Sequence, residues 1–367
     1  RPRNKPGPLE GPAPAGPRPL SMKRQPQSLR WSDWQPLPGW SPSPETLAET
    51  LDGGQSFRWS SVSPVDKLRA PSPSRGTPTT VADMEIGDHR IWTGTWSDCI
   101  AQLRLAAGAL EWRAPASLRK NVATALPHYL GLDRDWSVLT DALPWRSDAH
   151  LAQCLEAFPS LRLLRQPLGE TLLGFLCSAT KQIVQIKQMC ALLAERHGAE
   201  LGWNAASGRV QSASRTPRST FARSSDATFH RLPSWEELAN IPEKDLRACL
   251  LGFRARYIHA TAQYIAARPG WLKETELLPY AAAKARLLEL PGVGEKVADC
   301  VLLFGAVKLE AFPVDTWVLK SLARRYGLTG WKPAQVAQFG RAHFGPLAGL
   351  AQQYLFAWER KFGGRNL

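Results

Sequence analysis

Apolar and aromatic residues alternate with polar ones in the first part of the chain, which is typical of β-strands. This alternation predicts strands at 56–59, 89–95 and 100–105, and an apolar stripe predicts a helix over 44–51. Ala107-Gly108 before Leu110 and Trp112 marks a hairpin. We therefore expect an N-terminal antiparallel sheet domain over residues 31–142.

From residue 148 onward, apolar residues recur at the spacing of helices. Helices are predicted at 150–158, 168–197, 235–239, 243–251, 256–267, 281–290, 295–304, 316–326, 333–339 and 347–361. The longest of them can break near Ser178-Ala179-Thr180. The predicted fold class is α+β, with the sheet domain followed by an all-α domain over 143–367.

Three stretches are too polar or too rich in proline to form a core. Residues 1–30 are rich in proline and arginine, with Glu10 as the only acid, and predict a disordered tail in which Met22 is an alternative start. Residues 64–80 predict a Pro/Ser loop. Residues 206–228 are rich in Ser, Arg and Thr and predict a disordered basic insertion.

Charge and composition narrow the class of partner. The net charge of +14 suggests a polyanion, nucleic acid first and an anionic membrane surface second. No apolar run is long enough to span a membrane, and no secretory signal is apparent. The six cysteines contain no C-x-x-C pair and the seven histidines no H-x-x-x-H pattern. We therefore expect no disulfide framework, no zinc site and no iron–sulfur cluster.

The stretch 290–300 (LPGVGEKVADC) lies between two predicted helices and indicates a helix, a tight hairpin and a second helix. Gly292 and Gly294 permit positive φ and close backbone approach. The free N–H groups at the start of the second helix suit a phosphate. Lys296 lies in that first turn, where a lysine is unusual. A surface lysine on a structural turn is the simpler interpretation of the hairpin alone.

Two residues carry the candidate chemistry. A neutral lysine amine is a good nucleophile toward a carbon of acetal character, which makes Lys296 the first candidate. Asp315 precedes a predicted helix and fits an N-cap. Across a cleft from Lys296, its carboxylate could also stabilise a developing cation.

The hairpin sequence followed by 313–315 (PVD) resembles the helix-hairpin-helix DNA glycosylases, and most closely their 8-oxoguanine DNA glycosylase/lyase branch. Further segments fall in the same order and spacing, namely 53–59 (GGQSFRW), 162–166 (RLLRQ), 175–178 (FLCS), 254–257 (RARY), and Ala351-Gln352 with Leu355-Phe356. The resemblance covers roughly residues 30–360.

The resemblance implies a catalytic pair and a base-binding pocket. Lys296 would attack C1′ of the damaged nucleotide, expel the base and form a Schiff base that permits β-elimination. Asp315 would support the oxocarbenium-like transition state. The carbonyl of Gly54 would accept the N7 hydrogen that 8-oxoguanine has and guanine lacks. Cys300 and Phe356 would sandwich the flipped base, and Gln352 would bind its Watson–Crick edge.

The resemblance also implies how DNA is held. Backbone amides of Gly292, Val293 and Gly294 would bind a phosphate, with a structural monovalent cation at the hairpin. Arg254 would face the orphaned cytosine, with Phe253 beside it against the DNA.

This chain departs from the branch at three positions that would contact DNA. Thr180-Lys181-Gln182 replaces a run of three asparagines, Gln185 replaces an arginine that reads cytosine, and Trp317 replaces a phosphate-contacting histidine. These departures predict looser opposite-base selectivity.

Two other functions remain open at this stage. A monofunctional glycosylase for other damaged bases would need only Asp315, and a non-catalytic helix-hairpin-helix DNA-binding protein would need only the hairpin and the basic surface. The favoured prediction is a monomeric enzyme acting on double-stranded DNA that contains an oxidised purine. It would be cytoplasmic and nucleoid-associated in a bacterium, or nuclear or mitochondrial in a eukaryote.

Overall fold

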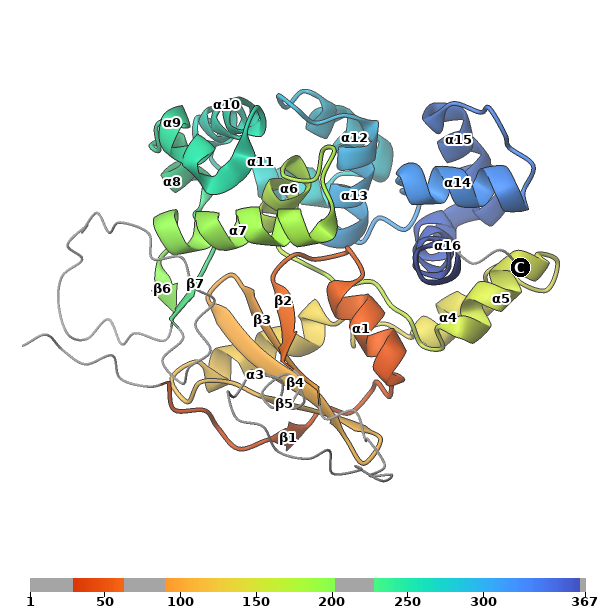
Figure 1. Cartoon of the computed structure of the whole chain (residues 1–367), viewed down its shortest axis with the longest axis horizontal. Helices are drawn as coiled ribbons and strands as arrows, with labels where there is room; N and C mark the ends of the chain where they lie inside the picture. Colours follow the sequence, from red (N-terminus) through yellow and green to blue (C-terminus); the bar gives the residue numbers. More distant parts are fainter. Residues whose placement is uncertain (1–28, 63–89, 202–227, 364–367) are drawn as a thin grey trace, which may run out of the picture.

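The computed structural model describes residues 29–62, 90–201 and 228–363. Nearly all of the predicted tail (1–30) and insertion (206–228), and the Pro/Ser loop (64–80), lie outside the described residues. The described parts form a sheet layer below a broad layer of helices (Figure 1).

A five-stranded antiparallel sheet occupies the N-terminal part, in the order β1-β5-β4-β3-β2. Its strands are β1 (Gln35–Pro36), β2 (Trp59–Val62), β3 (Ile91–Trp96), β4 (Cys99–Ala106) and β5 (Ala109–Arg113). Ala106 pairs with Ala109 across a two-residue turn, in which Ala107 and Gly108 both have positive φ (49° and 76°). This geometry matches the twist of the flanking strands and confirms the predicted hairpin.

Two helices, α1 (Pro44–Asp52) and α3 (Arg119–Tyr129), cover the sheet. The core between them contains the rings of Trp59, Trp96 and Tyr129, in which Trp96 stacks on both of the others and the centroids are 4.5–6.1 Å apart. The predicted helix at 44–51 is confirmed. Helix α3 was not predicted, because its sequence includes Pro127 and has no wide apolar stripe.

The second part of the chain is almost wholly helical, with only the two-stranded sheet β6 (Glu200–Leu201) and β7 (Phe229–His230) among its described residues. Its helices are α4 (Trp136–Asp141), α5 (Ala149–Ala157), α6 (Leu168–Leu176), α7 (Ile183–His197), α8 (Trp235–Ala239), α9 (Glu243–Leu246), η2 (Arg247–Leu251), α10 (Arg254–Ala266), α11 (Trp271–Leu277), α12 (Tyr280–Leu288), α13 (Glu295–Gly305), α14 (Thr316–Arg325), α15 (Pro333–Phe344), η3 (Gly345–Leu347) and α16 (Ala348–Phe362).

Helix α13 is the central helix of this layer. Every residue from Ala298 to Gly305 is buried, and α13 packs closely against α6 and α12.

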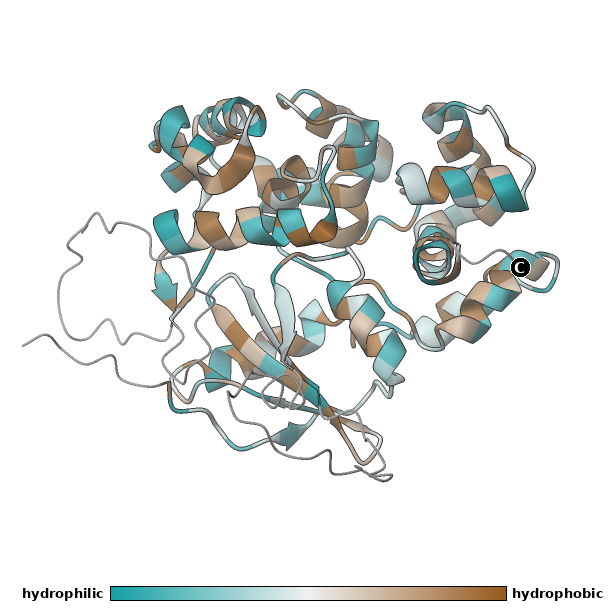
Figure 2. Ribbon diagram, viewed as in Figure 1, coloured by the Kyte–Doolittle hydropathy of each residue, from teal (hydrophilic) through white to brown (hydrophobic). Residues whose placement is uncertain are grey.

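Helix α7 faces solvent on one side, and Figure 2 shows apolar and polar segments alternating along it. The order of domains and the α+β class agree with the prediction.

The long predicted helix at 168–197 is broken where its sequence allowed. Helix α6 ends at Leu176, α7 begins at Ile183, and Thr180 between them has φ 54°. The link 177–182 contains Ser178 and Thr180, and both residues matter for the site below.

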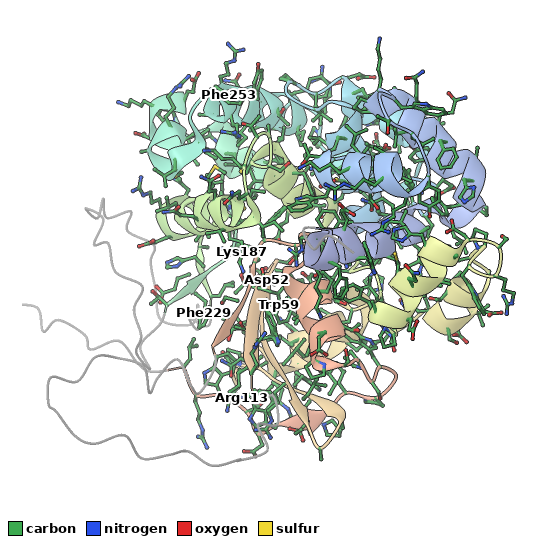
Figure 3. All side chains as sticks on the ribbon, turned by 45° about the vertical axis from the view of Figure 1, so that its right-hand side comes forward. Asp52, Trp59, Arg113, Lys187, Phe229 and Phe253 are labelled. Atoms are coloured by element: carbon green, nitrogen blue, oxygen red, sulfur yellow. The ribbon has the colours of Figure 1, made fainter. Side chains whose placement is uncertain are left out.

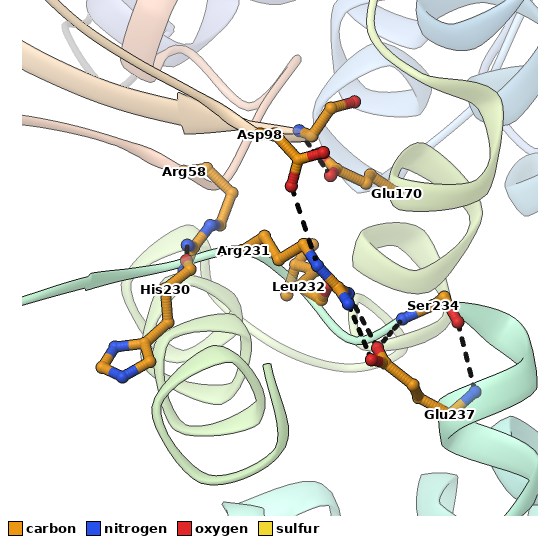
Figure 4. A network of polar contacts seen from close by, with 9 residues as sticks. Arg58, Asp98, Glu170, His230, Arg231, Leu232, Ser234 and Glu237 are labelled. Carbon is orange, nitrogen blue, oxygen red and sulfur yellow. Dashed lines mark hydrogen bonds and ion pairs between the residues drawn. The ribbon is translucent and has the colours of Figure 1, made fainter. Parts of the chain in front are cut away.

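Polar contacts fasten the sheet to the helices. The carboxylate of Glu170 on α6 accepts the Ser97 amide at the β3–β4 turn (2.7 Å), and Arg231 bridges Asp98 (3.8 Å) and Glu237 (2.6 Å), as Figure 4 shows. A further ion pair joins α7 to the end of α1, where Lys187 Nζ lies 2.7 Å from the carboxylate of Asp52 (Figure 3). That pair fixes the chain immediately before the Gly53-Gly54 segment.

Candidate active site

A cavity of about 40 Å³ lies between α13, the start of α14, α16 and the chain after α1. Its lining comprises Gly54, Phe175, Lys296, Cys300, Phe304, Pro313, Asp315, Gln352, Gln353 and Phe356. All six residues predicted to be catalytic or base-binding are among them. The fold thus brings together side chains that are far apart in the sequence.

The hairpin between α12 and α13 has the backbone geometry that its glycines predict. Gly292 has φ 81°, and a Cβ there would lie 2.7 Å from Cβ of Tyr257, so the position requires glycine. The amide of Val293 donates to the carbonyl of Leu290 (3.1 Å) and closes the turn. Gly294, in extended conformation, is the N-cap of α13 and has open space around its Cα. The first amides of α13 therefore face a region that an anion can approach.

Lys296 extends from the first turn of α13 into the cavity. Its amine lies 3.4 Å from Oγ of Ser178 and 5.0 Å from the centre of the Phe175 ring. The ring face attracts a cation, and the hydroxyl gives the amine one polar partner. These contacts direct the amine into the cavity.

Asp315 is both a helix cap and a cavity-lining residue. Its carboxylate accepts the amides of Trp317 and Val318, each at 2.9 Å, at the start of α14. Burial raises the pKa of Asp315 above its ordinary value, although the two amides and the charge of Lys296 oppose the rise. The sequence left open whether Asp315 is a helix cap or a carboxylate that faces Lys296 across a cleft. Both interpretations apply to this residue.

The predicted base-binding residues line the rest of the cavity. Gly54 has φ 103°, and a Cβ there would lie 3.1 Å from Cδ1 of Ile183 and 3.6 Å from the Phe356 ring. Burial raises the pKa of the Cys300 thiol to about 12, so the thiol is neutral near pH 7. Gln352 is only 4% exposed, and its Oε1 has no hydrogen-bond partner among the described residues. A buried, unsatisfied amide at a cavity wall is suited to a polar ligand.

The residues predicted to contact DNA opposite the lesion form a second group. The guanidinium of Arg254 donates to the carbonyls of Leu251 (3.2 Å) and Ala179 and to Oγ1 of Thr180 (3.0 Å). The ring of Phe253 is half exposed at the outer surface of the helical layer (Figure 3), with Arg254 stacked on it at 4.4 Å.

The predicted DNA contact Gln185 lies at the start of α7. Its side chain accepts the amide of Gln182 (3.2 Å) and so caps its own helix. Arg254 and Gln185 therefore both have partners within the protein.

Three residues of the site were missed from the sequence. Phe175 and Ser178 were noted only as part of a motif, and their contact with Lys296 depends on the break between α6 and α7. Gln353 also lines the cavity, and its Nε2 has no hydrogen-bond partner within the described part of the chain. The only signal for Gln353 in the sequence was its position next to Gln352. That signal is weak, because consecutive residues of a helix usually point to different sides.

The described parts of the chain show neither a membrane-spanning helix nor a cluster of metal ligands. No helix there is both long and apolar enough to cross a bilayer. No group of three or more His, Cys, Asp or Glu side chains in the described ranges is arranged to hold a metal ion.

Comparison with known families gives two matches. Residues 208–343 match the HhH-GPD superfamily of base excision DNA repair proteins, and residues 41–172 match the N-terminal domain of 8-oxoguanine DNA glycosylase. The two matches lie in the expected order on either side of the α6–α7 break. The helical part of the chain thus matches the HhH-GPD superfamily, and the sheet part matches the 8-oxoguanine DNA glycosylase N-terminal domain. The N-terminal match ends at residue 172, beyond the domain boundary predicted at residue 142. The boundary at residue 142 therefore stays a prediction.

Individual relatives agree with these two matches. The chain is 34% identical over 155 residues to a probable N-glycosylase/DNA lyase of Methanothermobacter thermautotrophicus, which covers 37% of this chain and 49% of the relative. It is 27% identical to an N-glycosylase/DNA lyase of Arabidopsis thaliana, over 86% of this chain and 77% of that protein. The chain thus spans about half the length of the archaeal relative and most of the plant one.

A solved structure is similar over most of its length. The 8-oxoguanine glycosylase/lyase of Clostridium acetobutylicum, in complex with double-stranded DNA containing cytosine opposite 8-oxoguanine, superposes with a TM-score of 0.68. The identity is 26%, over 86% of this chain and 92% of that one.

Proposed function

We propose that this protein is a bifunctional DNA glycosylase and AP lyase that removes 8-oxoguanine from duplex DNA. The observation that carries the proposal is the shared cavity of Lys296 and Asp315, whose wall includes Gly54, Gln352 and Phe356. The names of the relatives and the overall basic charge support it. A monofunctional glycosylase would not need an amine in the cavity, and a simple DNA-binding module would need no cavity.

In the proposed reaction, the damaged nucleotide leaves the base stack and enters the cavity. The Lys296 amine attacks C1′, the glycosidic bond breaks, and the base departs with the bonding electrons. The carboxylate of Asp315 stabilises the positive charge that develops on the sugar. The attached amine loses a proton as the sugar ring opens, which gives a Schiff base. Removal of a C2′ proton then expels the 3′ phosphate and nicks the strand.

Discrimination against guanine is assigned to the backbone of Gly54. Its carbonyl accepts the N7–H of 8-oxoguanine, whereas guanine would present an acceptor to an acceptor. Cys300, which is neutral near pH 7, and the ring of Phe356 are assigned to the two faces of the base. Gln352, with its unpartnered Oε1, is assigned to the Watson–Crick edge.

The hairpin is assigned to a DNA phosphate, through the amides of Gly292, Val293 and Gly294 and a bound monovalent cation. The enzyme would act as a monomer where the DNA is, either at a bacterial nucleoid or in a nucleus or mitochondrion. Arg254 and Phe253 are assigned to the side opposite the lesion. Because Arg254 and Gln185 already have partners within the protein, we expect weak discrimination among opposite bases.

A base-release assay tests this proposal. Duplexes would carry 8-oxoguanine opposite each of the four bases, with guanine opposite cytosine as the matched control. We expect release of 8-oxoguanine from all four duplexes at rates within about tenfold of one another, and none from the guanine control. If 8-oxoguanine is not released from any duplex, the proposed function is wrong.

A further inference from the structure

A largely buried lysine on α12 lies between two carboxylates of α13. The amine of Lys284 is 2.7 Å from Oε2 of Glu295 and 2.9 Å from Oδ1 of Asp299. The hydroxyl of Tyr280 also donates to Asp299 (2.7 Å). The side chains of Lys284 and Asp299 are 13% and 3% exposed, whereas that of Glu295 is 67% exposed. The Lys284 ammonium thus pairs with one buried carboxylate, that of Asp299, and with one exposed carboxylate, that of Glu295.

The position of Glu295 makes this arrangement important for the hairpin. Glu295 is the first residue of α13, directly between the N-cap Gly294 and Lys296. A carboxylate at a helix N-terminus is attracted by the free amides and the positive end of the helix dipole. An unrestrained Glu295 could therefore fold over the amides that a DNA phosphate would use, and would also repel that phosphate.

We propose that Lys284 is a positioning residue that holds the Glu295 carboxylate away from the front of α13 and so keeps the phosphate site open. The inference rests on the proposed function, in which the hairpin binds a DNA phosphate. The ion pair turns Glu295 sideways toward α12 and offsets part of its charge, so the amides of the first turn remain available. Asp299 has a different task, because it anchors the Lys284 amine from the buried side.

A purely structural role for Lys284 is the competing explanation, since its pair with Asp299 joins α12 to α13. The two explanations differ in what Glu295 does when Lys284 is lost. If Lys284 only joins the helices, removing the Glu295 charge cannot repair the damage. If Lys284 restrains Glu295, removing that charge restores binding.

The experiment uses the full chain and a duplex with a tetrahydrofuran abasic-site analogue, with affinity measured by fluorescence anisotropy. The starting variant is Lys284→Met/Asp299→Asn, because removing both members of a buried pair leaves no uncompensated buried charge. We expect this variant to bind about tenfold more weakly than the wild type. Adding Glu295→Gln should restore the affinity to within about twofold of the Glu295→Gln single variant, which itself binds at least as tightly as the wild type.

Two outcomes would overturn the inference. The first is a triple variant that binds as weakly as the double variant, and the second is a double variant that binds as tightly as the wild type. Thermal unfolding of each variant shows whether the fold is retained, and the rescue comparison is made between variants of equal stability. Wild-type binding to the abasic duplex tests the proposed function separately: its failure overturns that function, whereas wild-type binding without the predicted rescue overturns this inference alone.

Discussion

The amine of Lys296 lies 3.4 Å from the hydroxyl oxygen of Ser178, on the link between α6 and α7. The next two residues of that link, Ala179 and Thr180, accept hydrogen bonds from Arg254. One short link therefore contacts the proposed nucleophile on one side and the proposed opposite-strand contact on the other. The break between α6 and α7 is thus part of the site.

Replacing Ser178 with alanine tests whether its hydroxyl positions the amine. We expect Ser178→Ala to slow single-turnover base release about fivefold, the equivalent of one ordinary hydrogen bond. The affinity for an abasic-site duplex should stay within about twofold of the wild type, because Ser178 is not assigned to a phosphate. An unchanged rate would show that the hydroxyl does not position Lys296.

Asp315 allows its cap and its charge to be separated. Asparagine is as good an N-cap as aspartate, so Asp315→Asn should change the free energy of unfolding by less than about 1 kcal/mol. The same variant lacks the carboxylate and should lose a factor of about 10² to 10³ in base release. Asp315→Ala, the matched control, should lose both activity and about 1 kcal/mol of stability. Full activity in Asp315→Asn would mean that the residue is only a cap.

The raised pKa of Asp315 predicts the acid side of the pH profile. Because burial favours the neutral carboxyl, the carboxylate is lost at a higher pH than for an ordinary aspartate as the solution is acidified. Single-turnover base release should therefore begin to fall above the pH at which a free aspartate titrates, while DNA binding is still retained. The residual activity of Asp315→Asn should lack this fall, and a persistent fall would assign the limb to another group.

Asp148 predicts a pH dependence of stability away from the cavity. Burial raises its pKa, but the Leu151 amide, His343 (2.9 Å) and Tyr326 (2.8 Å) outweigh burial and hold the pKa below its ordinary value. A lowered carboxyl pKa stabilises the fold above the unfolded-state value near pH 4, and this stabilisation is lost as the pH falls through the folded-state value.

The measurement is urea unfolding of the wild type and Asp148→Asn, since asparagine keeps the cap of α5. We expect the wild type to be more stable by about 1–2 kcal/mol at pH 7, with the difference shrinking at pH 3. A difference that is constant between these two pH values would contradict the assignment.

The sequence predicted those parts of the site that local chemistry determines. The glycines at 292 and 294, the cap at Asp315 and the helical positions of Lys296 and Cys300 all follow from rules that act within a few residues. The family resemblance supplied the distant members, Gly54 and Phe356, which no local rule could have placed in the same cavity.

What the sequence could not predict depends on packing between distant segments. The contact of Lys296 with Ser178 needs the exact path of the link 177–182, and Thr180 there has a positive φ that residue type does not indicate. The pairing of Lys284 with Glu295 needs the crossing of α12 and α13. Helix α3 was not predicted because Pro127 within its sequence argues against a helix. Packing against the sheet stabilises the helix despite this proline.

Borohydride trapping on a duplex containing 8-oxoguanine is the most direct test of the central claim that Lys296 is the nucleophile. The wild-type protein should form a covalent adduct with the DNA, because borohydride reduces the Schiff base to a stable amine. Lys296→Gln should form no adduct while still binding the duplex and unfolding at a similar temperature. A trapped adduct of undiminished yield in Lys296→Gln would contradict the account.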